Sequence, residues 1–181
     1  MFTRTARLLL RPGWAEDARV LASAIGDERI VCNLATAPWP YGLSDAEEFL
    51  ARPRDRVLPS LLIFERTEDA PRLVGACGLG RTPSGGVQIG YWIALEFWGR
   101  GYATEAGGAL VEIARALRLP RLQASFFIDN PASGRVLEKL GFERTGITAP
   151  MLSRARGGEA RAEILSLELG SPAIVPQSMA A

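Results

Sequence analysis

The sequence predicts a mixed α/β (α+β) fold, in which one mostly antiparallel sheet of six to seven strands is flanked by about four helices. Segments typical of strands outnumber segments typical of helices. Closely spaced strands that suggest hairpins come early in the chain, and a strand–helix–strand–helix order comes late. Because no internal repeat and no second hydrophobic unit are visible, we expect one domain over residues 1–170 and a tail at 171–181.

The first half of the chain contains short strands and two helices. In chain order we expect a strand at 8–10, a helix at 14–25, a short helix from 44 to about 52, and strands at 58–65 and 73–79. The short helix is predicted from the capping-box pattern Ser44-Asp45-Ala46-Glu47, which follows a Pro-rich aromatic loop. The charged, Pro-containing connection between the last two strands indicates that they pair antiparallel.

The second half supplies the strand–helix units. We expect a strand at 87–93, a helix at 104–117, a strand at 121–128, a helix at 131–140, and strands at 142–144 and 163–169. Apolar residues recur every three or four positions in the longer helix, and Gly141 ends the later one. Gly107 and Gly108 lie inside the longer helix, where they indicate a close backbone approach.

The composition excludes several classes of function. A formal net charge of +1 gives no long-range attraction for nucleic acid or an anionic membrane, and no apolar run approaches the roughly 20 residues of a membrane-spanning helix. With no signal-peptide pattern either, we expect a cytoplasmic protein. The absence of histidine excludes Ser-His-Asp and Cys-His machinery and removes the commonest metal ligand. Cys32 and Cys77 lack a ligand-like spacing, so we expect two reduced, buried thiols and no metal.

Gly99 and Gly101 stand where a strand gives way to a helix, a place where backbone N–H groups can converge on a phosphate. A Gly-x-Gly pair alone is equally typical of a tight turn. The stretch lacks the Gly-Lys-Ser/Thr of a Walker loop, and Thr104 stands where a dinucleotide fold would need a third glycine. The sequence therefore indicates a phosphate-binding turn of another kind.

Three stretches in order have a known counterpart: residues 89–93 (IGYWI), 98–106 (WGRGYATEA) and 130–142 (NPASGRVLEKLGF). Together they resemble the GNAT acyltransferase superfamily, and within it the branch of ribosomal-protein-alanine N-acetyltransferases, in which residues 5–12 also have a counterpart. The resemblance covers roughly residues 5–169. It implies a GNAT-like sheet with splayed central strands and transfer of an acetyl group from acetyl-coenzyme A to an amine by direct attack on the thioester.

The resemblance also implies which residues bind the coenzyme. They are Trp92, Ile93, Ala94, Trp98, Gly99, Arg100, Gly101, Tyr102, Ala103, Thr104, Asn130 and Ser133. The amides of residues 99–104 would hold the pyrophosphate at the helix start, where anions are favoured. The backbone of residues 92–94 would pair with the pantetheine arm at the splay.

Two polar residues have both an ordinary and a functional explanation. Asn130, followed by Pro131, is what a helix N-cap prefers, and by resemblance it also contacts the coenzyme. Ser133 is unremarkable in a first helical turn, but related enzymes carry a serine here near the thioester sulfur. Ser133 is therefore our candidate for protonating the departing thiolate. Glu105 is expected to favour its helix N-terminus rather than act as a base.

Gln88 stands where enzymes of this branch often place a glutamate positioned to accept the amine proton. An amide can orient a water or an amine, but it cannot be the base at neutral pH. An α-amine with a pKa near 8 is roughly 10% neutral at pH 7, whereas a lysine amine near 10.4 is about 0.04% neutral. A missing base therefore favours a protein or peptide N-terminus, or a less basic small amine, as acceptor.

Two alternatives remain open. One is acetylation of a small amine such as an aminoglycoside, a polyamine or an amino acid. A polycationic acceptor would require clustered acidic residues, and only Asp45, Glu47 and Glu48 come close to such a cluster. These three are better explained as the solvated start of a helix. The other is a non-catalytic module that binds coenzyme A. We expect a monomer or a homodimer with no nucleic-acid or membrane partner.

Overall fold

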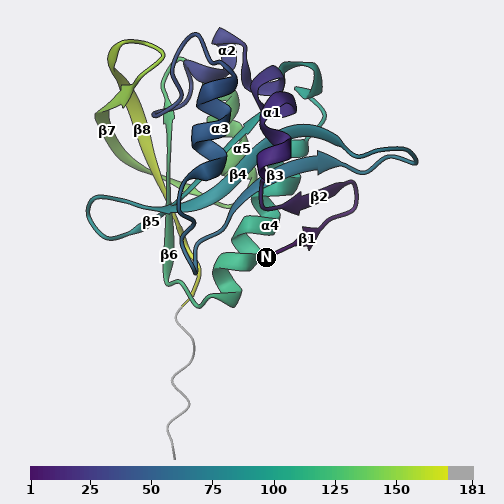
Figure 1. Ribbon diagram of the computed structural model, residues 1–181. Helices are drawn as coiled ribbons and strands as arrows, with labels where there is room; N and C mark the ends of the chain where they lie inside the picture. Colours follow the sequence, from purple (N-terminus) through teal and green to yellow (C-terminus); the bar gives the residue numbers. More distant parts are fainter. Residues whose placement is uncertain (171–181) are drawn as a thin grey trace, which may run out of the picture.

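A computed structural model describes residues 1–170, and within them shows one eight-stranded sheet with five α-helices around it (Figure 1). The strands are β1 (Thr3–Arg4), β2 (Leu8–Arg11), β3 (Ser60–Glu65), β4 (Arg72–Arg81), β5 (Val87–Ile93), β6 (Arg121–Phe127), β7 (Glu143–Ser153) and β8 (Gly158–Glu168). The helices are α1 (Ala18–Ile25), α2 (Glu28–Val31), α3 (Leu43–Ala51), α4 (Tyr102–Ala116) and α5 (Pro131–Lys139), with 3-10 turns η1 (Ala15–Asp17) and η2 (Leu95–Phe97). The predicted mixed fold is confirmed. Its extra members are β1 and α2, which are too short to show a periodic pattern.

The sheet has the order β1-β2-β3-β4-β5-β6-β8-β7, and every neighbouring pair is antiparallel except β5 and β6. Those two parallel strands share a single register pair, Gln88 with Gln123. Beyond this point the strands diverge towards the end of β5. The structure thus contains the expected splay between its central strands.

Helices cover both faces of the sheet, with α1 and α3 on one side and α4 on the other (Figure 1). Leu62 of β3 belongs to a buried cluster with Leu21 and Ala46, whereas the next residue, Ile63, belongs to the cluster that contains Leu110 of α4. Because both faces are covered, β3 is a continuous apolar run rather than an alternating one. The sheet is therefore the rigid layer on which the surrounding loops are mounted.

Helix α3 begins earlier than the sequence pattern indicates. Its N-cap is Gly42, whose backbone N–H donates to Asp45 Oδ2 at 2.8 Å. The predicted capping box of Ser44 and Glu47 is therefore wrong, because Ser44 already lies inside the first turn. Asp45, three residues after Gly42, accepts the N–H of the cap residue as in a capping box, although Gly42 has no side chain to cap the helix in turn.

The hairpin of β7 and β8 is much longer than predicted, with 11 residues in each strand. Most side chains of β7 are exposed, so its sequence shows no apolar alternation that would predict a strand beyond Arg144. A bulge between Arg144 and Thr148 interrupts the ladder, and Gly157 closes the hairpin turn at a φ of 69°. The turn, at 154–157, lies close to the functional site described below.

The two cysteines are free thiols in different environments. Cys77 is buried in β4, and burial raises the pKa of its thiol. Cys32 is only partly buried, so the expectation of two buried thiols is wrong for it. None of the helices in residues 1–170 has the length and apolarity needed to cross a bilayer, and the predicted tail at 171–181 lies outside the described residues.

Candidate functional site

A cavity of about 400 Å³ opens between the N-terminal ends of α4 and α5 and the end of β5. We call it the α4–α5 cavity. Of the residues predicted to bind the coenzyme, those that line it are Trp92, Ile93, Trp98, Gly99, Gly101, Tyr102, Ala103, Thr104, Asn130 and Ser133. Ala94 and Arg100 do not. The structure therefore brings together two stretches that are about thirty residues apart in the chain.

Three basic side chains line the same cavity, and no acidic one does: Arg29, Arg135 and Lys139. Arg29 is compensated by an ion pair with Asp27, whereas Arg135 and Lys139 have no ion-pair partner among residues 1–170. These three residues were not among those predicted from the sequence to bind the coenzyme. The available signal was the spacing of Arg135 and Lys139, which places them on one face of α5.

The glycine turn leaves the start of α4 open to the cavity. Gly99 and Gly101 have φ values of 75° and 79°, in the left-handed region that residues other than glycine rarely adopt. Gly101 is the N-cap of α4 and no side chain caps this end, so the first amides of the helix have no internal partner. The carbonyl of Arg100 accepts a hydrogen bond from Arg7 Nη1 at 2.9 Å, which fixes the turn from its outer side.

The backbone groups at the end of β5 determine which of residues 92–94 are free to pair with a pantetheine arm. The N–H of Ala94 donates to the carbonyl of Val74 at 2.8 Å, and the carbonyl of Ala94 accepts from the N–H of Phe97 at 2.9 Å. The N–H of Ala94 is therefore already used within the protein, and its carbonyl already accepts one hydrogen bond. By the alternation of an antiparallel ladder, the backbone of Trp92 also faces β4, which leaves the amide of Ile93 pointing into the splay. The carbonyl of Ile93 accepts from Trp98 Nε1 at 2.7 Å.

Asn130 and Ser133 lie at the start of α5, as predicted. Asn130 Oδ1 accepts a hydrogen bond from the Ser133 N–H at 3.3 Å, and Pro131 occupies the first turn. The Tyr91 hydroxyl lies 3.0 Å from Ser133 Oγ and donates to the Ser133 carbonyl at 3.2 Å. Burial raises the pKa of Tyr91 to about 12, so its phenol stays protonated at neutral pH. Tyr91 was not among the site residues predicted from the sequence.

A second cavity, of about 380 Å³, lies above β4 and β5. We call it the α3–β5 cavity, because α3 forms one wall; the segment 34–38 and Arg154 form the others. Gln88 lines this cavity, and Leu34, Tyr91 and Trp92 line both cavities. The two cavities therefore meet at a shared wall that contains the Tyr91 ring.

Glycines in β4 and β5 leave open space above the sheet in the α3–β5 cavity. Gly78, Gly80 and Gly90 line it, and a Cβ placed on Gly80 or Gly90 would meet no atom within 4 Å. Neither of these two glycines is needed for close packing inside the protein. The space above them is available to a bound molecule.

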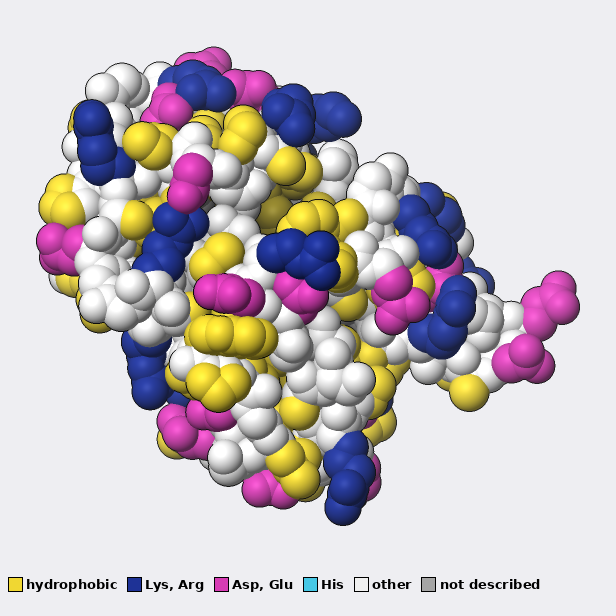
Figure 2. All heavy atoms as spheres, turned by 90° about the horizontal axis from the view of Figure 1, so that it is seen from above, with side chains coloured by type: hydrophobic (Ala, Val, Ile, Leu, Met, Phe, Trp, Pro, Cys, Tyr) yellow, Lys and Arg dark blue, Asp and Glu magenta, His cyan; other side chains and the backbone are white. Residues whose placement is uncertain are grey.

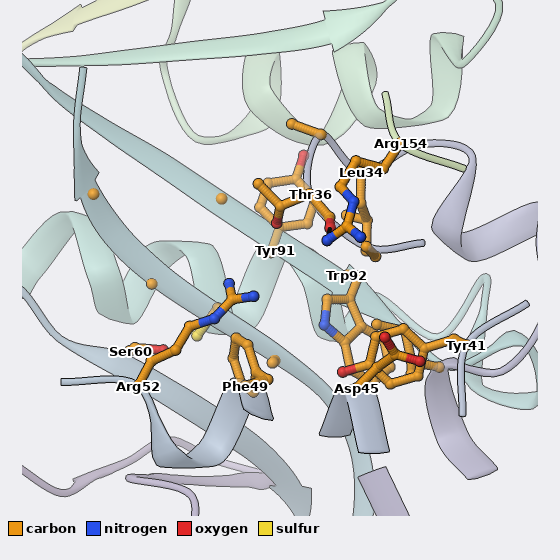
Figure 3. A pocket seen from close by; sticks show the side chains of 18 of the residues that line it. Leu34, Thr36, Tyr41, Asp45, Phe49, Arg52, Ser60, Tyr91, Trp92 and Arg154 are labelled. Atoms are coloured by element: carbon orange, nitrogen blue, oxygen red, sulfur yellow. Dashed lines mark hydrogen bonds between the residues drawn. The ribbon is translucent and has the colours of Figure 1, made fainter. Parts of the chain in front are cut away.

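The charged side chains of the α3–β5 cavity are balanced in number: Asp45, Glu48, Arg52 and Arg154. Glu48 and Arg52 form an exposed ion pair at 2.9 Å, while Glu47 lies outside the cavity. Figure 3 shows the guanidinium groups of Arg52 and Arg154 pointing into the cavity from different sides. The face in Figure 2 shows the same mixture on a larger scale, with basic and acidic side chains interspersed around a hollow.

The turn of the β7–β8 hairpin fixes the segment 32–36, which forms the wall opposite α3. Ser153 Oγ, fully buried, donates to the carbonyl of Leu34 at 2.9 Å, and the N–H of Arg154 donates to the carbonyl of Ala35 at 3.1 Å. Arg156 Nε donates to the carbonyl of Cys32 at 2.6 Å. The wall is thus held by three successive anchors from one turn.

The remaining carboxylates near the coenzyme-binding stretches line neither cavity. Glu105 Oε1 accepts from Thr5 Oγ1 at 2.5 Å and from the Arg7 N–H at 2.8 Å. Burial alone raises the pKa of Glu105, but these hydrogen bonds and the Arg7 guanidinium outweigh it and hold that pKa below its usual value. Glu143 is exposed at the start of β7. Within residues 1–170, no three His, Cys, Asp or Glu side chains gather as a metal-ligand set.

Comparisons with known proteins agree with this architecture. The family model described as Acetyltransferase (GNAT) domain matches residues 7–143. The curated protein "Uncharacterized N-acetyltransferase p20" of Bacillus licheniformis is 28% identical over 152 residues, which cover 79% of this chain and 83% of that protein.

Two solved structures illustrate the similarity of fold. The acetyltransferase (GNAT family) from Bacillus anthracis has a TM-score of 0.79 at 20% identity, with 93% of this chain and 99% of that chain covered. The ribosomal-protein-S5-alanine acetyltransferase from Vibrio fischeri has a TM-score of 0.72 at 16% identity, with 93% and 96% covered. At these identities, the likeness concerns the fold.

Proposed function

Because the chain belongs to the GNAT acetyltransferase family and transfers an acetyl group from acetyl-coenzyme A, we propose that its acceptor is the α-amine at the N-terminus of a protein or peptide. The observation that carries this proposal is the contrast in charge between the two cavities. The α4–α5 cavity has basic side chains and no acids, which suits the phosphates of the coenzyme. The α3–β5 cavity has equal numbers of acids and arginines, which does not suit a polycationic aminoglycoside or polyamine.

The donor is placed by backbone groups in this proposal. The pyrophosphate binds the free amides at the start of α4, after the turn of Gly99 and Gly101. Arg135 and Lys139 provide further cationic contacts. The pantetheine arm enters the splay beside the Ile93 amide, so that the thioester reaches the wall that both cavities share.

The reaction takes place at that shared wall. The neutral amine, in the α3–β5 cavity, attacks the thioester carbon, the carbon–sulfur bond breaks, and the nitrogen releases a proton to water. The thiolate takes a proton from the Ser133 hydroxyl, which regains one from water. Tyr91 holds the Ser133 hydroxyl through the 3.0 Å contact between their oxygens. With a pKa of about 12, Tyr91 does not serve as the base. Gln88 orients the amine or a water beside it.

The missing base favours an α-amine over a lysine side chain, because the more acidic α-ammonium supplies far more neutral amine at pH 7. The ribosomal-protein-S5-alanine acetyltransferase from Vibrio fischeri, which shares the fold, is consistent with an acceptor of this kind.

The test is thiol release from acetyl-coenzyme A with three acceptors: a lysine-free peptide with a free N-terminus, the same peptide with a blocked N-terminus and one internal lysine, and a polyamine. Only the first should be turned over efficiently, and mass spectrometry should place the acetyl group on its α-amine. Efficient turnover of the polyamine with none of the free peptide would overturn the proposal.

A further inference from the structure

We propose that the α3–β5 cavity selects amines that also carry a carboxylate, and that Arg154 is the residue that binds this carboxylate. The inference rests on the proposed function, since it concerns the same acceptor cavity. It adds a chemical class, namely acceptors with an anionic group near the reacting amine. For a protein acceptor this means an acidic side chain next to the N-terminal residue.

The backbone of Arg154 is held in place by its neighbours, while its side chain is exposed. Its own N–H is bonded to Ala35, and the residues on either side, Ser153 and Arg156, bond to the same wall segment. Arg156 also forms a two-point ion pair with Asp129, at 2.7 and 2.9 Å. The backbone of Arg154 is therefore fixed from both sides, and its side chain extends from a rigid base into the cavity (Figure 3).

The guanidinium of Arg154 is one of two charges in the cavity that have no ion-pair partner among residues 1–170, the other being the Asp45 carboxylate. Arg52 is paired with Glu48, and Asp45 accepts the N–H of Gly42 as part of the α3 cap. Arg154 has no ion pair with any residue of the described chain, and its one hydrogen bond, from Nη1 to the Thr36 carbonyl, is long at 3.5 Å. Most of its donors are thus free, in the planar arrangement that binds a carboxylate at two points.

The position of Arg154 relative to Gln88 and Tyr91 determines which acceptors it can bind. Gln88 and Tyr91 lie on the floor of the cavity, whereas Arg154 belongs to the wall formed by the hairpin turn. Because Tyr91 and Arg154 line one cavity of about 380 Å³, we take the amine and the carboxylate that reach them to belong to the same or adjacent residues. The pair of charges, ammonium and carboxylate, also matches a cavity in which acids and arginines balance.

The experiment measures kcat/KM per unit of neutral amine for two pairs of acceptors that differ only in charge. The first pair is an amidated Ser-Asp-Ala-Ala peptide and its Ser-Asn-Ala-Ala counterpart; the second is alanine and alaninamide. We expect the wild-type enzyme to prefer the carboxylate in the accepted pair by about tenfold or more. In Arg154→Gln the ratio should fall to near one. Arg161→Gln, an exposed arginine on β8 outside both cavities, should keep the wild-type ratio.

The outcomes separate this inference from the proposed function. If peptides are accepted without any preference for the acidic one, the inference is overturned and the proposed function stands. If peptides are refused but alanine is preferred over alaninamide in an Arg154-dependent way, the proposed function fails and the inference stands. The wild-type ratio alone tests the preference for a carboxylate, and the Arg154→Gln ratio tests which residue binds it. Unchanged stabilisation of Arg154→Gln by acetyl-coenzyme A controls for its folding.

Discussion

The two cavities that meet at Tyr91 and Trp92 are built in different ways. The α4–α5 cavity includes the main-chain groups of two helix starts, and its predicted coenzyme-binding residues fall in short contiguous stretches. The α3–β5 cavity is made by side chains from α3, β4, β5, the segment 34–38 and Arg154. Backbone geometry demands particular residues at particular positions, whereas a wall of side chains tolerates many. The first cavity can therefore keep a recognisable sequence pattern while the second varies with the acceptor.

Breaking the backbone-built cavity should have the largest effect. Gly101→Val places a β-branched side chain at a φ of 79° beside the free amides of α4. We expect the melting-temperature rise produced by acetyl-coenzyme A to disappear, and turnover to fall by about a hundredfold. Gly146→Val is the matched control, since Gly146 has a φ of 75° and open space around it but lies on β7. A full thermal shift in Gly101→Val would contradict the assignment of the pyrophosphate to this turn.

Filling the side-chain-built cavity should separate acceptor from donor. Gly90→Leu adds a side chain where no atom lies within 4 Å, so the fold should accommodate it while the α3–β5 cavity loses volume. The expected result is an unchanged thermal shift with acetyl-coenzyme A and a drop of about tenfold or more in kcat/KM for the amine. Gly158→Leu, also in open space but on β8, should leave both measurements unchanged. Loss of the coenzyme shift in Gly90→Leu would mean that the two cavities do not divide the substrates as described.

Substitutions at the wall that both cavities share should lower kcat without changing coenzyme affinity. Ser133→Ala and Tyr91→Phe each remove one hydroxyl of the pair that lies 3.0 Å apart, and each should lower kcat by about tenfold with little change in coenzyme affinity. Because Tyr91 is proposed to act through Ser133, the double variant should be no slower than Ser133→Ala. Additive losses would show that Tyr91 acts independently, and an unchanged Ser133→Ala enzyme would remove that serine from the mechanism.

The smallest expected effect is a shift along the pH axis. With Gln88 in place, log kcat/KM should rise with pH until the acceptor amine is deprotonated, so the rising limb should follow the acceptor's own pKa. Gln88→Glu introduces a carboxylate able to take the proton and should move that limb to lower pH. The measurement compares both enzymes on two accepted amines of different basicity. A wild-type profile set near pH 6 for both amines would instead reveal a base on the enzyme.

The sequence was sufficient to predict β2 to β6 and the position of the glycine turn, because those features depend on local periodicity and on φ values that glycine favours. It was insufficient for the β7–β8 hairpin, whose exposed side chains carry no alternation. The α3 cap was misplaced by two residues because Gly42 contributes no side chain to a pattern. The α3–β5 cavity could not be predicted, since Asp45, Gln88 and Arg154 become neighbours only through the fold.

The β7–β8 hairpin has a consequence for how such an enzyme diverges. It lies at the edge of the sheet, none of its residues lines the α4–α5 cavity, and yet its turn both anchors the segment 32–36 and presents Arg154. With the roles proposed above, drift in the length or charge of this turn would redirect the enzyme to a new amine and leave the thioester chemistry intact. In an evolving lineage the hairpin is thus the exchangeable part, and paralogues should differ there before they differ at Gly99 or Gly101.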